Sequence, residues 1–126
     1  MTGRGFAESV LVVDDTDFMV QVLSDLFAAE GFQVHSARSG PEALILYDRV
    51  LPDLVTLDLV MPGMDGLAVL AALREIDPAA RVVMVSAVGQ EERVMDAIRL
   101  GARNYVLKPI DREKVLETVR RVLDDY

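Results

Sequence analysis

The chain has 126 residues, of which 52% are hydrophobic and 27% are charged, and its formal net charge is −8. This length suits one folded domain, so we expect a single domain over residues 1–126. Because phosphate contacts dominate affinity for nucleic acid, an acidic chain without a basic stripe argues against direct nucleic-acid binding. The chain has no cysteine and only one histidine, His35, which excludes disulfides, thiolate metal sites and sites built on several histidines.

The sequence contains neither a recognisable secretory leader nor a membrane helix. The first apolar run, Val10–Val13, is too short for the core of a signal peptide and is followed directly by acidic residues. No segment approaches the roughly 18 apolar residues of a membrane-spanning helix. We therefore expect a cytoplasmic protein without membrane association.

The first half of the chain alternates short apolar runs with segments of helical periodicity. Val10–Val13 is apolar and mostly β-branched, which predicts a buried strand. An amphipathic helix ending at Gly31 is predicted by apolar residues three and four positions apart, namely Phe18, Met19, Val22, Leu23, Leu26 and Phe27. Gln33–Ala37 predicts a weaker strand. The next helix is predicted to start near Pro41, because Ser39 and Glu42 resemble a capping box, and to continue over Ala43–Val50.

The second half continues the alternation to a total of five strands and five helices. The remaining strands are predicted over Leu54–Leu57, Arg81–Val85 and Tyr105–Leu107. The remaining helices are predicted over Leu67–Ile76, Glu91–Leu100 and Arg112–Leu123. Such alternation predicts an α/β fold in which helices cover both faces of a parallel sheet. Right-handed crossovers restrict the topology to a doubly wound sheet, where ligands bind beyond the carboxyl ends of the strands.

Four of the predicted strands end at polar side chains. The first ends at Asp14-Asp15, the third at Asp58, the fourth at Ser86 and the fifth at Lys108. Because parallel strands end at one edge of a sheet, we expect these side chains to lie close together. Three carboxylates at one edge would repel one another unless a cation lay among them.

The predicted cation is Mg²⁺. Oxygen ligands without histidine or cysteine favour a hard ion, and Mg²⁺ typically combines a few carboxylates with waters and a phosphate. Lys108 would add a positive charge for a phosphate oxygen, and Ser86 would add a hydroxyl donor. Phosphoryl transfer requires mostly positioning and charge neutralisation, so the pattern predicts a phosphoryl-transfer site.

From about Ser9 to Leu123, the sequence resembles the response-regulator receiver domains. The similarity lies in Val12-Val13-Asp14-Asp15, Leu57–Gly66 around Asp58, Ser86-Ala87, Tyr105 and Lys108-Pro109. The segment Val85–Gln90 and the Phe18-Met19 pair are similar in particular to the stand-alone chemotaxis regulators of this family. The resemblance implies a flavodoxin-like sheet of strand order 2-1-3-4-5 and a cis peptide bond before Pro109.

The resemblance also implies a role for each residue of the site. Asp58 would be the phosphoacceptor and would take its phosphoryl group from a phosphohistidine of a histidine kinase. Asp15 would ligate Mg²⁺ directly and Asp14 through water, while Asp58 and the backbone carbonyl of Val60 would complete the protein ligands. Lys108 would pair with the phosphoryl group.

The remaining implied roles concern switching and the lifetime of the phosphorylated state. Ser86 would close onto the phosphoryl group and Tyr105 would turn inward, changing the face formed by the fourth helix, fifth strand and fifth helix. In the family, the residues two positions beyond the phosphoacceptor and the switch hydroxyl orient the hydrolytic water. Here these residues are Val60 and Val88, whose apolar side chains predict slow loss of phosphate.

The expected function is therefore a two-component response regulator, which is not an enzyme and catalyses only its own phosphorylation and autodephosphorylation. The expected partners are a histidine kinase and a downstream protein such as a flagellar motor or a phosphatase, with the chain a monomer or a phosphorylation-dependent dimer. The last predicted helix runs into Asp124-Asp125-Tyr126 without a linker, which favours a stand-alone regulator. A receiver that controls an attached or separate DNA-binding or enzymatic output is the alternative.

A more distant alternative is a phosphatase of the haloacid-dehalogenase type. Asp15-Thr16-Asp17 resembles that family's nucleophile-and-acid pair, with Asp15 as the nucleophile and Ser86 and Lys108 as later motifs. However, the short chain leaves no room for a cap domain, and this interpretation gives Asp58 no role. The aspartate that becomes phosphorylated distinguishes the two families.

Overall fold

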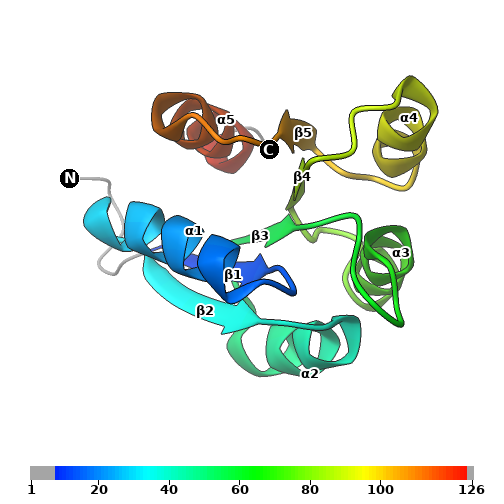
Figure 1. The fold of residues 1–126 in the computed structure, drawn as a ribbon. Helices are drawn as coiled ribbons and strands as arrows, with labels where there is room; N and C mark the ends of the chain where they lie inside the picture. The colour runs from blue at the N-terminus through cyan, green and yellow to red at the C-terminus, as the bar shows by residue number, and fades with distance from the viewer. Residues whose placement is uncertain (1–7, 125–126) are drawn as a thin grey trace.

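The computed structural model describes residues 8–124, in which strands and helices alternate without exception (Figure 1). The strands are β1 (Ser9–Val13), β2 (Gln33–Ala37), β3 (Leu54–Leu57), β4 (Val82–Ser86) and β5 (Asn104–Leu107). The helices are α1 (Asp17–Ala29), α2 (Gly40–Val50), α3 (Gly66–Ile76), α4 (Glu91–Arg99) and α5 (Arg112–Asp124).

All of the strands join one parallel sheet of order β2-β1-β3-β4-β5. This arrangement confirms the predicted doubly wound fold. Helices α1 and α5 cover one face of the sheet, and α2, α3 and α4 cover the other (Figure 1). The layers explain why the central strands are apolar at successive positions, because both of their faces are buried.

Each face of the sheet has its own apolar core, and alternate residues of β1 pack into one core or the other. Val10 and Val12 of β1 pack with apolar side chains of α1 and α5. Leu11 and Val13 instead pack with side chains of α2, α3 and α4. All four side chains are almost completely buried. Burial of a valine or leucine side chain contributes about 1.5–3 kcal/mol, so both cores hold β1 and its carboxyl end in place.

The observed boundaries lie close to the predicted ones, with differences that have local causes. Strand β4 runs from Val82 to Ser86 instead of Arg81–Val85, because Ser86 pairs with Leu107 of β5 and therefore belongs to the strand. The Ser39 side chain accepts a hydrogen bond from the backbone N–H of Glu42, as a helix cap should. The Glu42 carboxylate, however, accepts from the N–H of Arg38 and not from that of Ser39.

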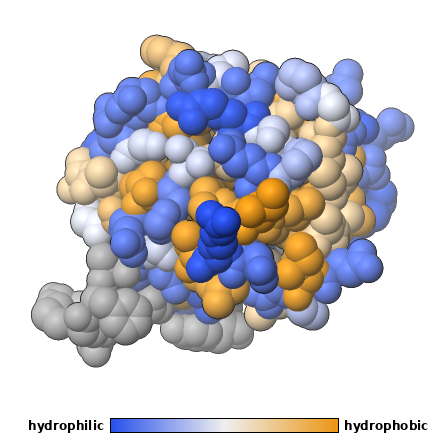
Figure 2. Space-filling view, turned by 90° about the horizontal axis from the view of Figure 1, so that it is seen from below, coloured by the Kyte–Doolittle hydropathy of each residue, from blue (hydrophilic) through white to orange (hydrophobic). Residues whose placement is uncertain are grey.

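The surface is mixed in polarity. In Figure 2, which views the molecule from the side where α2 lies in Figure 1, hydrophobic residues are gathered among hydrophilic ones. Ile45 and Leu51, in and just after α2, are among the exposed large hydrophobic residues. None of the helices within residues 8–124 has the length and apolar character needed to cross a membrane.

Candidate functional site

The acidic residues predicted for the site meet at the carboxyl end of the sheet. Val13 pairs with Leu57, so the residues that follow these two strand ends emerge side by side. One carboxylate oxygen from each of Asp14, Asp15 and Asp58 lies within 4.8 Å of the others. Asp14 and Asp58 are buried, and Asp15 is the more exposed of the three. Carboxylates this close attract a cation strongly.

Lys108 supplies a positive charge to this cluster. Its Nζ donates to Asp14 Oδ2 at 2.9 Å and to Asp58 Oδ2 at 3.2 Å. Burial acts to lower the pKa of Lys108, but the hydrogen bond to Asp14 and the charges of Asp58 and Asp14 outweigh it and hold the pKa above its ordinary value. Lys108 therefore stays protonated at neutral pH. The peptide bond between Lys108 and Pro109 is cis, as expected.

The donor set fits Mg²⁺. All three clustered side chains offer carboxylate oxygens, and within residues 8–124 this is the only such group of histidine, cysteine and acidic side chains. Mg²⁺ prefers oxygen ligands and needs few of them from protein. The backbone N–H of Val60 lies 3.4 Å from Asp58 Oδ1, so residue 60 borders the cluster.

Asp14 is also held by Thr16, a contact that the sequence did not predict. Asp14 Oδ1 accepts from the backbone N–H and from the hydroxyl of Thr16, each at 2.9 Å. Together with Lys108, these donors engage both oxygens of a carboxylate that is 1% exposed. A residue that can cap a helix directly after an acidic pair was the available sequence signal.

Ser86 and Tyr105 lie on neighbouring strands and meet at the β4–α4 loop. Ser86 is fully buried at the end of β4, and its Oγ accepts from the backbone N–H of Val88 at 3.2 Å. Tyr105 is half-buried, and its hydroxyl donates to the carbonyl of Val88 at 2.5 Å. The two side chains thus contact the same residue of one loop through its N–H and its carbonyl.

The two valines predicted to control phosphate lifetime differ in their surroundings. Val60 is 59% exposed beside the carboxylates. Val88 is half-buried and packs against the core cluster that α2, α3 and α4 cover, as does Tyr105. An apolar side chain at position 60 therefore meets solvent next to the acids, whereas position 88 is partly committed to packing.

Gly66 positions the backbone of Asp58, and the sequence did not single it out. The N–H of Gly66 donates to the carbonyl of Leu59 at 2.7 Å. A Cβ atom at position 66 would lie 2.2 Å from the carbonyl oxygen of Asp58 and 2.6 Å from the Cα of Leu59. Only glycine allows α3 to begin this close to the strand end. Its place after Asp65, which caps α3 through the N–H of Ala68, was the available signal.

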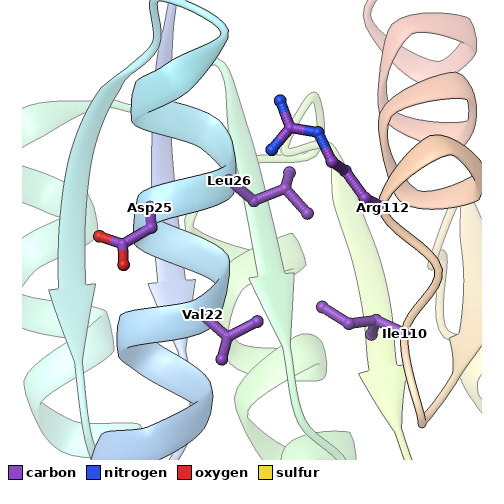
Figure 3. A pocket seen from close by; sticks show the side chains of 5 residues that line it. All are labelled: Val22, Asp25, Leu26, Ile110 and Arg112. Atoms are coloured by element: carbon purple, nitrogen blue, oxygen red, sulfur yellow. The ribbon is translucent and has the colours of Figure 1, made fainter.

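A separate hollow of about 300 Å³ lies between α1 and the start of α5 (Figure 3). Val22 and Leu26 of α1 face Ile110 and Arg112 across it, whereas the carboxylate of Asp25 points away (Figure 3). None of the predicted site residues lines this hollow. The candidate site is therefore the acidic cluster at the carboxyl end of the sheet, and this hollow is not part of it.

Comparison with known proteins identifies the family to which the chain belongs. The family model of the response regulator receiver domain matches residues 10–120. The chain is 40% identical to the chemotaxis protein CheY of Bacillus subtilis, over 94% of this chain and 99% of that protein. It is 44% identical to CheY of Treponema pallidum, over 95% of this chain and 85% of that protein.

A solved structure extends the comparison to the fold. A chain of the CheX–CheY–BeF₃–Mg²⁺ complex from Borrelia burgdorferi superimposes with a TM-score of 0.91 and 44% identity, covering 94% of this chain and 90% of that one. This chain belongs to the response-regulator receiver family, as a CheY-like regulator of the two-component type. Receiver domains bind Mg²⁺, and the acidic cluster found here is suited to that ion.

Proposed function

We propose that Asp58 accepts a phosphoryl group from a phosphohistidine of a histidine kinase. The observation that carries this proposal is the Lys108 ammonium between Asp58 and Asp14, in a cluster of three carboxylates. An Asp58 oxygen forms a bond to phosphorus as the P–N bond breaks, and the product is an aspartyl phosphate. The electron pair of the broken bond stays on the imidazole, which takes up a proton from solvent and leaves as neutral histidine. Lys108 neutralises the charge that the phosphoryl oxygens bring.

The metal ligands in this proposal are Asp15 and Asp58 directly, Asp14 through water, and the backbone carbonyl of Val60. When bound, Mg²⁺ supplies positive charge to the transferring phosphoryl group. The more exposed position of Asp15 supports its role as a direct ligand, because Asp14 already accepts hydrogen bonds from Thr16 and Lys108.

Phosphorylation then changes the surface of α4, β5 and α5 through Ser86 and Tyr105. The support for this step is their shared contact with Val88 at the start of the β4–α4 loop. A phosphoryl oxygen that recruits the Ser86 hydroxyl alters the loop that Tyr105 also contacts. A change in population requires that the phosphoryl group favour one arrangement of this loop over the other.

The α4–β5 face suits a protein partner. Only Ala97 of α4 is buried, and Met95, Ile98 and Leu107 are 40–50% exposed. The same helix carries the acidic residues Glu91, Glu92 and Asp96, of which Asp96 pairs with Arg99 at 3.6 Å. We infer a downstream protein with apolar anchors and basic neighbours, such as a component of the flagellar motor or a phosphatase.

In this proposal the chain is one cytoplasmic receiver domain over residues 1–126 and catalyses only its own phosphorylation and autodephosphorylation. It acts as a monomer or as a phosphorylation-dependent dimer, without direct contact to nucleic acid or membrane. Control of an attached or separate DNA-binding or enzymatic output is the alternative output, and the chemistry at Asp58 would be the same.

The identity of the phosphorylated aspartate tests the proposal. The protein is incubated with acetyl phosphate and Mg²⁺, and the acyl phosphate is converted by hydroxylamine into a hydroxamate that peptide mass spectrometry can locate. We expect the modification at Asp58 and its loss in Asp58→Asn. Modification at Asp15 would instead support the phosphatase of the haloacid-dehalogenase type.

A further inference from the structure

Asp14 is held in one orientation by donors on two sides. Its Oδ1 accepts from the N–H and the hydroxyl of Thr16, each at 2.9 Å, and its Oδ2 accepts from Lys108 Nζ at 2.9 Å. The carboxylate is 1% exposed, so solvent offers it little alternative hydrogen bonding. Which oxygen of Asp14 faces Lys108 is therefore decided by these protein donors.

The Thr16 hydroxyl also belongs to the start of α1. Its Oγ accepts from the backbone N–H of Met19 at 3.4 Å, which makes Thr16 the N-cap of the helix. A hydroxyl can donate one hydrogen bond while it accepts others. The hydroxyl therefore connects Asp14 to the first turn of α1, and its contact with Asp14 is the shorter of the two.

We propose that Thr16 is a positioning residue for the acidic site. Its hydroxyl fixes the rotation of the Asp14 carboxylate, so that Oδ2 stays directed at Lys108 when Mg²⁺ binds. This inference rests on the metal site of the proposed function. Partners that orient metal ligands typically affect metal affinity by roughly 10–100-fold. Because the backbone N–H of Thr16 remains in any variant, we expect the lower end of that range.

The test compares Thr16→Val with Thr16→Ser. Valine keeps the branched shape and suits the extended backbone of residue 16, but it has no hydroxyl, whereas serine retains one. Ser39→Ala is the matched control, because Ser39 caps α2 in the same manner, through the backbone N–H of Glu42. Mg²⁺ affinity is measured by calorimetry, stability by urea denaturation, and the carboxylate itself by the ¹³C shift of its carboxyl carbon without metal.

We expect Thr16→Val to bind Mg²⁺ about tenfold more weakly and to move the Asp14 carboxyl shift. Thr16→Ser should restore both. Ser39→Ala should lose stability from its missing cap but keep the parent's affinity. Thr16→Gly provides a second test, because glycine is tolerated at an N-cap but has no hydroxyl.

Parent-like Mg²⁺ affinity in both Thr16→Val and Thr16→Gly would overturn the inference and leave Thr16 as a helix cap only. A failure of Thr16→Ser to restore affinity would overturn it as well. If the parent itself binds no Mg²⁺, the metal site of the proposed function is wrong. An unmoved Asp14 carboxyl shift in Thr16→Val would then reject the positioning role on its own.

Discussion

The charge balance of the site depends on single residues. Asp14 and Asp58 are buried beside each other, and Lys108 donates to both. Because folding raises the pKa of Lys108 above 10.5, its stabilising charge is fully present below that pH and is lost as the pH rises through the folded-state value. One ammonium neutralises only part of three carboxylates, which leaves the cluster attractive to a divalent cation.

Asp15→Asn tests the contribution of the more exposed carboxylate. We expect the affinity for Mg²⁺ to fall by about tenfold or more, since about 1.4 kcal/mol of lost ion attraction already corresponds to tenfold. Calorimetric titration of parent and variant measures this change. Asp17→Asn is the control, because Asp17 is paired with Arg38 and lies outside the cluster. An unchanged affinity in Asp15→Asn would rule out the proposed ligand set.

Val60 and Val88 are predicted to prolong the phosphorylated state. Neither side chain can orient or deprotonate the attacking water, and such polar assistance is typically worth roughly 10²–10⁴-fold in rate. Val60→Asn combined with Val88→Glu should therefore hasten loss of phosphate while Mg²⁺ binding stays near the parent's, because in the proposed metal site residue 60 would contribute only its backbone carbonyl. Phosphate release is followed after a pulse of acetyl phosphate, with excess donor removed.

The single variants separate the two positions. Val60 is exposed beside Asp58, whereas Val88 is half-buried and packs against the core. We therefore expect Val60→Asn to account for most of the acceleration. A double variant that loses phosphate no faster than the parent would show that these side chains do not control the water.

At the level of elements, the site lies at the carboxyl ends of strands whose positions were predicted from the sequence. Apolar runs followed by Asp14, Asp58 and Lys108 predicted that these side chains would meet, because parallel strands share an edge, and the pairing of Val13 with Leu57 explains the meeting. The Thr16 contact was not predicted, because a capping residue after an acidic pair does not by itself show that its N–H and hydroxyl both donate to Asp14. Strand β4 includes Ser86, one residue beyond the predicted apolar run, because Ser86 pairs with Leu107 of β5.

Gly66 shows how the β3–α3 loop supports the site, and Gly66→Ala tests this role. The added methyl would collide with the backbone of Asp58 and Leu59, and overpacking of this kind typically costs about 1–3 kcal/mol. We expect a lower free energy of unfolding by urea denaturation and slower phosphorylation by acetyl phosphate. Gly89→Ala is the control, because its methyl would meet only the flexible side chain of Leu107. Equal stability of Gly66→Ala and the parent would contradict the close approach.

At the scale of the whole molecule, the central strands of the sheet are more deeply buried than its β5 edge. The central strands are buried on both faces, whereas α4 buries only Ala97 and β5 is an edge strand. Elements with few buried apolar contacts are the ones that rearrange at low cost in free energy. The acidic cluster thus lies at the ends of the buried central strands, whereas Lys108 and the proposed output face belong to the weakly anchored β5 edge.

The measurement that tests the switch most directly is an NMR comparison with and without beryllofluoride and Mg²⁺, which together mimic a phosphoryl group on Asp58. We predict that the amide signals of residues 90–103 and of Tyr105 shift together with those around Asp58, and that Asp58→Asn abolishes all of these shifts. Perturbations confined to the immediate surroundings of Asp58, with α4 and Tyr105 unchanged, would contradict the account.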